Sequence, residues 1–168
     1  KSLQNSDELK KALKEEENQI QSQERHSSYI LSEWAKLERS EERLMDLANI
    51  RNYIAKLQKT SEEKEDSSAR RIARRSLNQV YAGSYETALF TYERAKKYNQ
   101  ALISFELANE IYPKSPRISY DRARVYGLSG QKKKALEFLE KAVGFGFKNW
   151  QELESEKGFD NIRQLSRA

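Results

Sequence analysis

The chain has 168 residues, with no Cys, two Pro and six Gly, and a formal net charge of +5 at pH 7. The lack of Cys excludes disulfides, thiolate metal sites and cysteine nucleophiles. No apolar run approaches the roughly 18 residues that a membrane-spanning helix needs, so the sequence predicts no membrane span.

Helix-forming residues dominate the first half of the chain. Residues 1–82 contain neither Gly nor Pro and are rich in Glu, Lys, Leu, Ala, Arg and Gln. This composition predicts long helices joined by short polar segments, and therefore an all-α fold. Residues 1–66 carry 12 Lys and Arg against 15 Asp and Glu, whereas residues 67–168 carry 19 against 11. The basic character therefore belongs to the second part.

Residues 1–66 are predicted to form a long-helix, coiled-coil-like segment. The first helix is expected to start at Asn5, with Glu8 completing a capping pair, and to end in a polar joint around His26. A second helix of about thirty residues is expected from Tyr29 to Leu57, because apolar residues recur every three, four or seven positions. The members of this stripe are Ile30, Trp34, Leu37, Leu44, Leu47, Ile50, Ile54 and Leu57.

A stripe of that length needs a partner. The sequence favours an antiparallel helix within the same chain, and a homodimer through the N-terminal helices is the alternative. The polar residues 59–68 are the predicted turn, with Thr60 and Glu63 as a second capping pair. The returning helix is expected to continue through Gly83, because helical periodicity persists on both sides of it.

The second half of the chain contains an internal repeat. The stretch YNQALISFELANEIYPKSP (98–116) and the stretch KKKALEFLEKAVGFGFKNW (132–150) align at an offset of 34 residues. Small residues occupy matching positions, as expected where two helices cross closely. The matched pairs are Ala101 with Ala135, and Ala108 with Ala142.

This period and pattern resemble the tetratricopeptide repeat, a helix–turn–helix unit of the same length. The resemblance implies a right-handed α-solenoid over residues 67–149, with units at about 82–115 and 116–149 and a turn at Pro113–Pro116 that starts the second unit. Residues 150–168 then resemble the short capping helices that follow a last repeat. Their apolar residues are Trp150, Leu153, Phe159, Ile162 and Leu165.

The same resemblance implies a concave groove that binds a protein or peptide partner, or an upstream domain of the same chain. The family's groove positions fall near Glu86, Phe90, Glu93 and Arg94 in the first unit. In the second unit they fall on Arg117, Tyr120, Asp121, Arg124 and Leu128. The two arginines favour an acidic or carboxylate-bearing peptide, although the Lys and Asn set of the family's carboxylate clamp is not reproduced.

No residue pattern predicts catalysis, a cofactor or a metal. The only histidine, His26, has no neighbouring nucleophile or placed acid, and the stretch GLSGQKKK lacks the spacing of a phosphate-binding loop. The sequence therefore predicts a non-enzymatic interaction scaffold.

Two alternatives stay open at this point. The chain begins with Lys1, so it fits an accessory C-terminal domain of a larger, secreted bacterial enzyme; the compartment is then cytoplasmic, or periplasmic or secreted if a signal peptide has been removed. The other alternative is nucleic-acid binding through a basic stripe, against the simpler interpretation of a solvated helix face. The stripe consists of Arg70, Arg71, Arg74 and Arg75.

Overall fold

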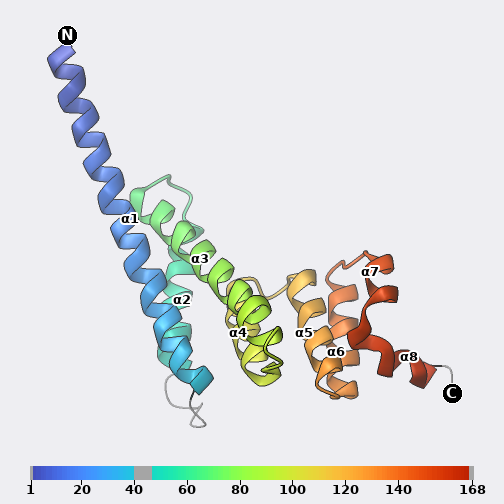
Figure 1. Ribbon diagram of the computed structural model, residues 1–168. Helices are drawn as coiled ribbons and strands as arrows, with labels where there is room; N and C mark the ends of the chain where they lie inside the picture. The colour runs from blue at the N-terminus through green and yellow to red at the C-terminus, as the bar shows by residue number, and fades with distance from the viewer. Residues whose placement is uncertain (1, 40–46, 167–168) are drawn as a thin grey trace. The chain divides into compact units, whose positions relative to one another are not determined.

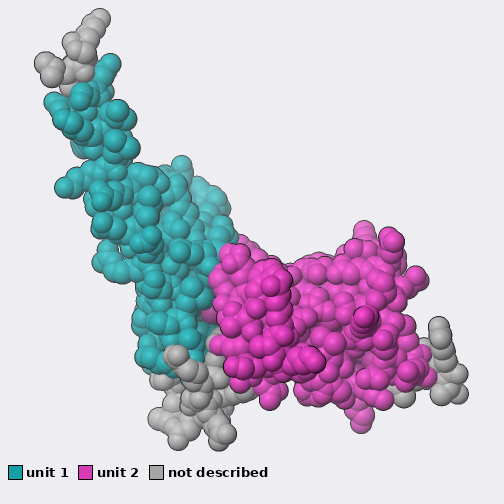
Figure 2. Space-filling view, in the orientation of Figure 1, with its two compact units in different colours: residues 1–80 teal, residues 81–168 magenta. Residues whose placement is uncertain are grey.

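The protein consists of helices and no strands over the part that its computed structural model describes, residues 2–39 and 47–166 (Figure 1). The predicted all-α fold is confirmed. Two compact units divide the chain, Lys1–Val80 and Tyr81–Ala168 (Figure 2). No helix in the described residues combines the length and the apolar character that crossing a membrane requires.

The first unit contains α1 (Ser2–Arg39), α2 (Leu47–Ser61) and the first part of α3 (Ser68–Glu86). All three helices contribute apolar side chains at helical spacing to its core. Five residues of the predicted stripe are therefore covered within one chain: Ile30, Trp34, Ile50, Ile54 and Leu57. The buried residues are Ile30, Trp34, Ile50, Ile54, Leu57, Ala73, Leu77 and Val80.

The helix boundaries in this unit differ from the predicted ones. α1 already includes Asn5 and runs on through His26, so the predicted start and the predicted polar joint are both wrong. The Ser27 hydroxyl donates to the Glu24 carbonyl at 3.2 Å, which satisfies a polar group of the expected joint inside the helix. With neither Gly nor Pro present, nothing interrupts the helix there.

The single helix predicted from Tyr29 to Leu57 is also wrong. α1 ends at Arg39, α2 begins at Leu47, and the two helices contact each other. Two shorter helices that pack together bury their apolar faces locally, whereas one long helix leaves its stripe in need of an equally long partner. Leu44 and the side chain of Leu37 lie outside the described residues.

The predicted capping pair before α3 is wrong as well. Thr60 lies within α2, where its hydroxyl donates to the Lys56 carbonyl at 3.1 Å. Ser67 performs the capping, because its hydroxyl oxygen accepts from the Arg70 amide at 3.1 Å. Several Ser and Thr residues lie near this turn, and the local sequence does not show which of them caps α3.

The second unit begins within α3, which passes through Gly83 without a break, as predicted. It continues with the π-helical segment η1 (Thr87–Glu93), followed by α4 (Tyr98–Ile111), α5 (Pro116–Leu128) and α6 (Lys132–Gly144). α4 packs against η1 and α5, and α5 packs against α6. A short C-terminal group completes the unit: α7 (Trp150–Ser155), η2 (Lys157–Phe159) and α8 (Asp160–Ser166).

The 34-residue period of the sequence coincides with the helix starts, since α4 begins at Tyr98 and α6 at Lys132. The alanines that align at this offset are fully buried, as their small size predicts. Ala101 and Ala108 lie on α4, and Ala135 and Ala142 lie on α6.

The turns before α4 and α6 share one backbone geometry. Lys96 and Gly130, again 34 positions apart, both have positive φ, 56° and 80°. In each turn the following residue donates its N–H to the carbonyl five positions back, at 2.8 and 2.9 Å. This is the Schellman arrangement, which favours glycine at the left-handed position.

The turn between α4 and α5 also follows the sequence. Ser115 caps α5, its hydroxyl oxygen accepting from the Ile118 amide at 3.2 Å, and Pro116 occupies the first turn of the helix. Pro is tolerated there because its missing N–H has no partner inside the helix. The prediction that this segment starts the next helix is confirmed.

The C-terminal group covers part of the core of the second unit. Phe159 is fully buried and packs with Tyr120, Phe138 and Phe147. Leu153 and Ile162 are partly buried against the same cluster, whereas Trp150 keeps 53% of its surface exposed. The side chain of Leu165 lies outside the described residues.

Candidate ligand-binding groove

Three of the five predicted groove residues of the second repeat are buried. Tyr120 and Asp121 have no exposed surface, and Arg124 is 8% exposed. The Tyr120 ring stacks on Phe147 with the ring centroids 4.2 Å apart. Only Arg117 and Leu128 retain exposed surface from which they could contact a ligand.

Asp121 is the centre of a buried charge network. Its carboxylate accepts from Arg124 at 2.6 Å and from Arg117 at 3.1 Å. The Tyr85 hydroxyl donates to the same carboxylate at 2.5 Å. Burial and the Asp121 charge raise the pKa of Tyr85 to about 12, so the phenol stays protonated and serves as a donor.

Each arginine of the network also binds a second carboxylate. Arg124 donates two hydrogen bonds to Glu93, at 3.1 and 2.8 Å, and Arg117 donates two to Glu152, at 2.8 and 2.9 Å. Burial alone would lower the pKa of Arg124, but the Glu93 hydrogen bonds and the Asp121 charge outweigh it and raise that pKa. The network therefore joins η1, α5 and α7 and holds its charged groups in fixed positions.

A groove opens beside this network. Its volume is about 340 Å³, and residues from η1, the turn after it, α4 and α5 line it: Leu89, Phe90, Glu93, Arg94, Lys96, Tyr98 and Leu128. Phe90 is 55% exposed and Leu128 is 38% exposed, so the groove presents apolar surface to solvent. We call these seven residues the η1 groove. Phe90, Glu93 and Arg94 are positions that the sequence predicts for the first repeat, and Leu128 is one that it predicts for the second.

The η1 groove carries a net positive charge. Glu93 is already neutralised by Arg124, whereas Arg94 and Lys96 make no ion pair within the described residues. The Arg94 guanidinium lies 4.6 Å from the centroid of the Phe90 ring, which places a cation directly beside the exposed aromatic surface. An acidic group would therefore find its charge partner next to an apolar contact.

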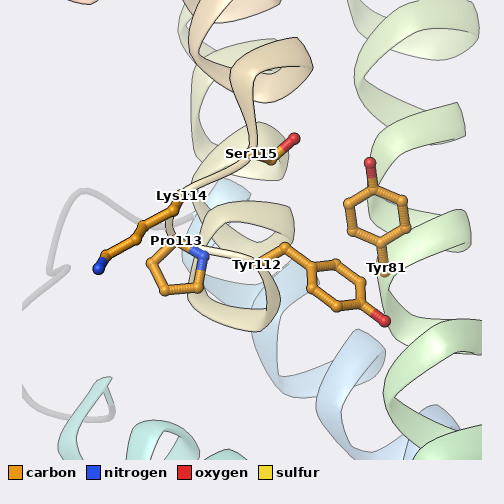
Figure 3. A pocket seen from close by; sticks show the side chains of 5 residues that line it. All are labelled: Tyr81, Tyr112, Pro113, Lys114 and Ser115. Carbon is orange, nitrogen blue, oxygen red and sulfur yellow. The ribbon is translucent and has the colours of Figure 1, made fainter. Parts of the chain in front are cut away.

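A second hollow in this unit is mainly aromatic (Figure 3). Tyr81, Tyr112, Pro113, Lys114 and Ser115 line a cavity of about 580 Å³. The Tyr81 and Tyr112 rings meet edge to face at a centroid distance of 4.9 Å. Figure 3 shows these two side chains among the five that line the hollow. Lys114 is the only charged side chain among these five, so the hollow offers mostly ring surface and little to fix the orientation of a ligand.

The predicted basic stripe makes contacts within the first unit. Arg75 pairs with Glu16 at 2.7 Å, and Arg71 pairs with Asp66 at 3.1 Å. Arg70 donates to the Lys64 carbonyl in the α2–α3 connection, and Arg74 donates to the carbonyl of Ser61, the last residue of α2. These contacts link α3 to α1 and to the turn before it, and they occupy part of the donor capacity that phosphates would need.

No protein-family model, no curated protein and no solved structure matches this chain. The chemistry of the η1 groove is therefore inferred from its own residues. No cluster of three or more metal-ligating side chains occurs within the described parts of the chain.

Local sequence contains part of the signal for this site. Arg117, Asp121 and Arg124 are spaced three and four residues apart on one helix, the spacing at which ion pairs form. Tyr85 and Glu152 are 36 and 35 positions from their partners, so no local pattern indicates them. Lys96 and Tyr98 line the groove because they lie in and directly after the turn before α4.

Proposed function

We propose that this protein is a non-enzymatic, tetratricopeptide-like interaction module whose η1 groove binds an acidic peptide segment that carries a large apolar side chain. The observation that carries the proposal is the pairing of exposed Phe90 with Arg94, 4.6 Å away, in a groove that Leu128 completes. The apolar side chain would bury Phe90, and the acidic groups would face Arg94 and Lys96.

The charge network supports this function through rigidity. Glu93 lines the groove and is held by two hydrogen bonds from Arg124, which is itself bonded to buried Asp121. A preformed groove loses less conformational entropy on binding than a mobile one does. In a larger parent protein the occupant would be another domain of the same chain, and that is the accessory-domain version of the proposal.

Direct binding of labelled peptides tests the proposal. We expect acidic peptides that contain Leu or Phe to bind the whole chain, as measured by fluorescence anisotropy, and matched basic peptides not to bind. Phe90→Ala should weaken binding by about tenfold, because a buried aromatic contact is lost. Arg94→Glu should weaken it further and reduce its dependence on salt.

Two changes on α6 serve as matched controls. Leu136→Ala truncates an apolar residue that is 45% exposed, and Lys133→Glu reverses an exposed charge, both outside the groove. Both should leave the affinity unchanged. Equal losses for Leu136→Ala and Phe90→Ala, or no preference for acidic peptides, would refute the proposal.

The nucleic-acid alternative has no comparable observation behind it. Arg70, Arg71, Arg74 and Arg75 all make hydrogen bonds within their own unit. A steep, sequence-independent loss of RNA or DNA binding with rising salt would be the result that restores it.

A further inference from the structure

A second candidate site lies in the first unit, between α1 and α2. Ser22, Arg25, His26 and Tyr29 follow one another at helical spacing on α1, and Tyr53 faces them from α2. These five residues line a cavity of about 480 Å³, which is within the size range of small-molecule pockets. We call it the His26 pocket.

The wall of the His26 pocket is aromatic and held by a hydrogen bond. The Tyr53 hydroxyl lies 2.5 Å from Nδ1 of His26. The Tyr29 and Tyr53 rings meet at a centroid distance of 4.7 Å, and the His26 and Tyr53 rings at 5.7 Å. Three rings from two helices therefore provide a surface against which a planar group can pack.

Arg25 sets the sign of the charge at this pocket. Burial, and then the charge of Arg25, lower the pKa of His26, so Arg25 is the one group of the five that is charged at neutral pH. Arg25 is exposed and makes no ion pair within the described residues. A cationic ligand would meet an uncompensated positive charge here, whereas an anion would gain a partner.

Hydroxyl and imidazole groups add hydrogen-bond donors beside that cation. Ser22 offers a hydroxyl one turn before Arg25. When Tyr53 donates to Nδ1 of His26, the imidazole proton resides on Nε2, which is then available as a further donor. A guanidinium, a hydroxyl and an N–H group are the usual partners of an oxyanion, and Arg25, Ser22 and His26 supply all three among the residues that line this cavity.

We propose that the His26 pocket binds an oxyanion carried on an aromatic ring, with Arg25 and Ser22 holding the oxyanion and Tyr29 and Tyr53 packing against the ring. The assignment uses residues of α1 and α2 only, so it does not depend on the η1 groove. Phosphate and carboxylate share the required chemistry, and an aryl phosphate contains both parts of the ligand.

The single histidine of the chain provides a specific readout. Its imidazole resonances are unique in an NMR spectrum of the full chain, and we expect them to shift saturably when phenyl phosphate is added. Inorganic phosphate and phenol each contain only one part of this ligand. Each should bind at least about tenfold more weakly than phenyl phosphate. If either half binds as tightly as the whole, or if His26 does not respond to phenyl phosphate, the assignment is wrong.

Matched variants show which residues contribute to the binding free energy. Arg25→Gln should weaken phenyl phosphate binding by about tenfold or more, because a charge-assisted hydrogen bond is lost. Lys14→Gln removes the same charge from an exposed position on the same helix, outside the pocket, and should leave the affinity unchanged. Tyr29→Leu should weaken phenyl phosphate but not inorganic phosphate. Equal effects of Arg25→Gln and Lys14→Gln would reduce the binding to a general charge effect and overturn the proposal.

A phosphotyrosine peptide shows whether the oxyanion belongs to a partner protein or to a small molecule. If the oxyanion belongs to a partner protein, a short peptide with a central phosphotyrosine should bind more tightly than phenyl phosphate, because flanking residues add contacts. If it belongs to a small molecule, the peptide should bind more weakly than phenyl phosphate.

Discussion

Gly127 on α5 and Gly158 in η2 approach so closely that a Cβ atom on Gly127 would lie 1.9 Å from the Gly158 carbonyl oxygen. In the other direction, a Cβ on Gly158 would lie 2.9 Å from the carbonyl oxygen of Arg124, which is also on α5. Both glycines are buried, and the second is followed directly by the buried ring of Phe159. The pair therefore allows the C-terminal group to pack against α5 at backbone distance.

Gly127→Ala should separate these two segments. The added methyl group meets backbone rather than a flexible side chain, so relief requires the C-terminal group to move, and we expect a loss of about 1–3 kcal/mol in the free energy of unfolding. Urea denaturation followed by circular dichroism measures it. Gly144→Ala is the matched control, because nothing lies within 4 Å of its Cβ position. Equal stability of the two variants would contradict the close contact.

Lys96 and Gly130 allow a reciprocal exchange at equivalent turns. Lys96 holds a left-handed conformation, φ 56°, that favours glycine, so Lys96→Gly should raise the free energy of unfolding by about 0.5–1 kcal/mol. Gly130→Lys should lower it by a similar amount, since φ there is 80° and only the backbone strain changes, with no atom within 4 Å of the Cβ position. Thermal melts of the two variants test this. A shift in the same direction for both would mean that the two turns are not equivalent.

The sequence was sufficient to predict those features that depend on residue spacing or on residues adjacent in the chain. The buried alanines Ala101 and Ala135 follow from spacing and side-chain size, and the start of α5 follows from Ser115 and Pro116. Helix ends without such residues were not predictable. The contact between α1 and α2 involves residues far apart in the sequence, so the apolar spacing from Tyr29 to Leu57 did not reveal it.

The candidate site was predictable only in part, for a similar reason. Phe90, Glu93, Arg94 and Leu128 could be expected at a groove from the repeat pattern. The burial of Asp121 could not, because it depends on Tyr85, which is 36 positions away in the chain. A charged residue on a helix looks the same in sequence whether it faces solvent or a buried partner.

Asp121→Asn should be strongly destabilising. It leaves Arg124, whose side chain is 9% exposed, without one of its two carboxylate partners, and it weakens the acceptor of the Tyr85 hydroxyl. Removing one member of a buried ion network costs about 3 kcal/mol or more, which urea denaturation would measure.

The exposed pair of Lys141 and Glu137, 3.0 Å apart on α6, provides the comparison for Asp121→Asn. Glu137→Gln should change stability far less, because water replaces the lost partner. Similar losses for the two variants would mean that burial of the Asp121 network contributes nothing.

The stability of the first unit should fall as the pH drops below 6.5, because of His26. Burial, and then the charge of Arg25, lower the pKa of His26 in the folded protein below its ordinary value of 6.5. The unfolded chain therefore takes up the proton first, and protonation favours unfolding. The stability contribution is complete above pH 6.5, declines as the pH falls from there to the lower folded pKa, and is constant below it.

His26→Gln isolates this effect. The variant cannot be protonated at this position, so the difference in free energy of unfolding between wild type and variant should change with pH in that window. Burial raises the pKa of the Tyr53 phenol, so the hydrogen-bond partner of His26 stays protonated across this window. Carboxylates that titrate at lower pH are common to both proteins and cancel in the difference. Urea denaturation at a series of pH values provides the measurement, and a wild-type-minus-variant difference that is flat across the window would show that His26 keeps an ordinary pKa in the folded protein.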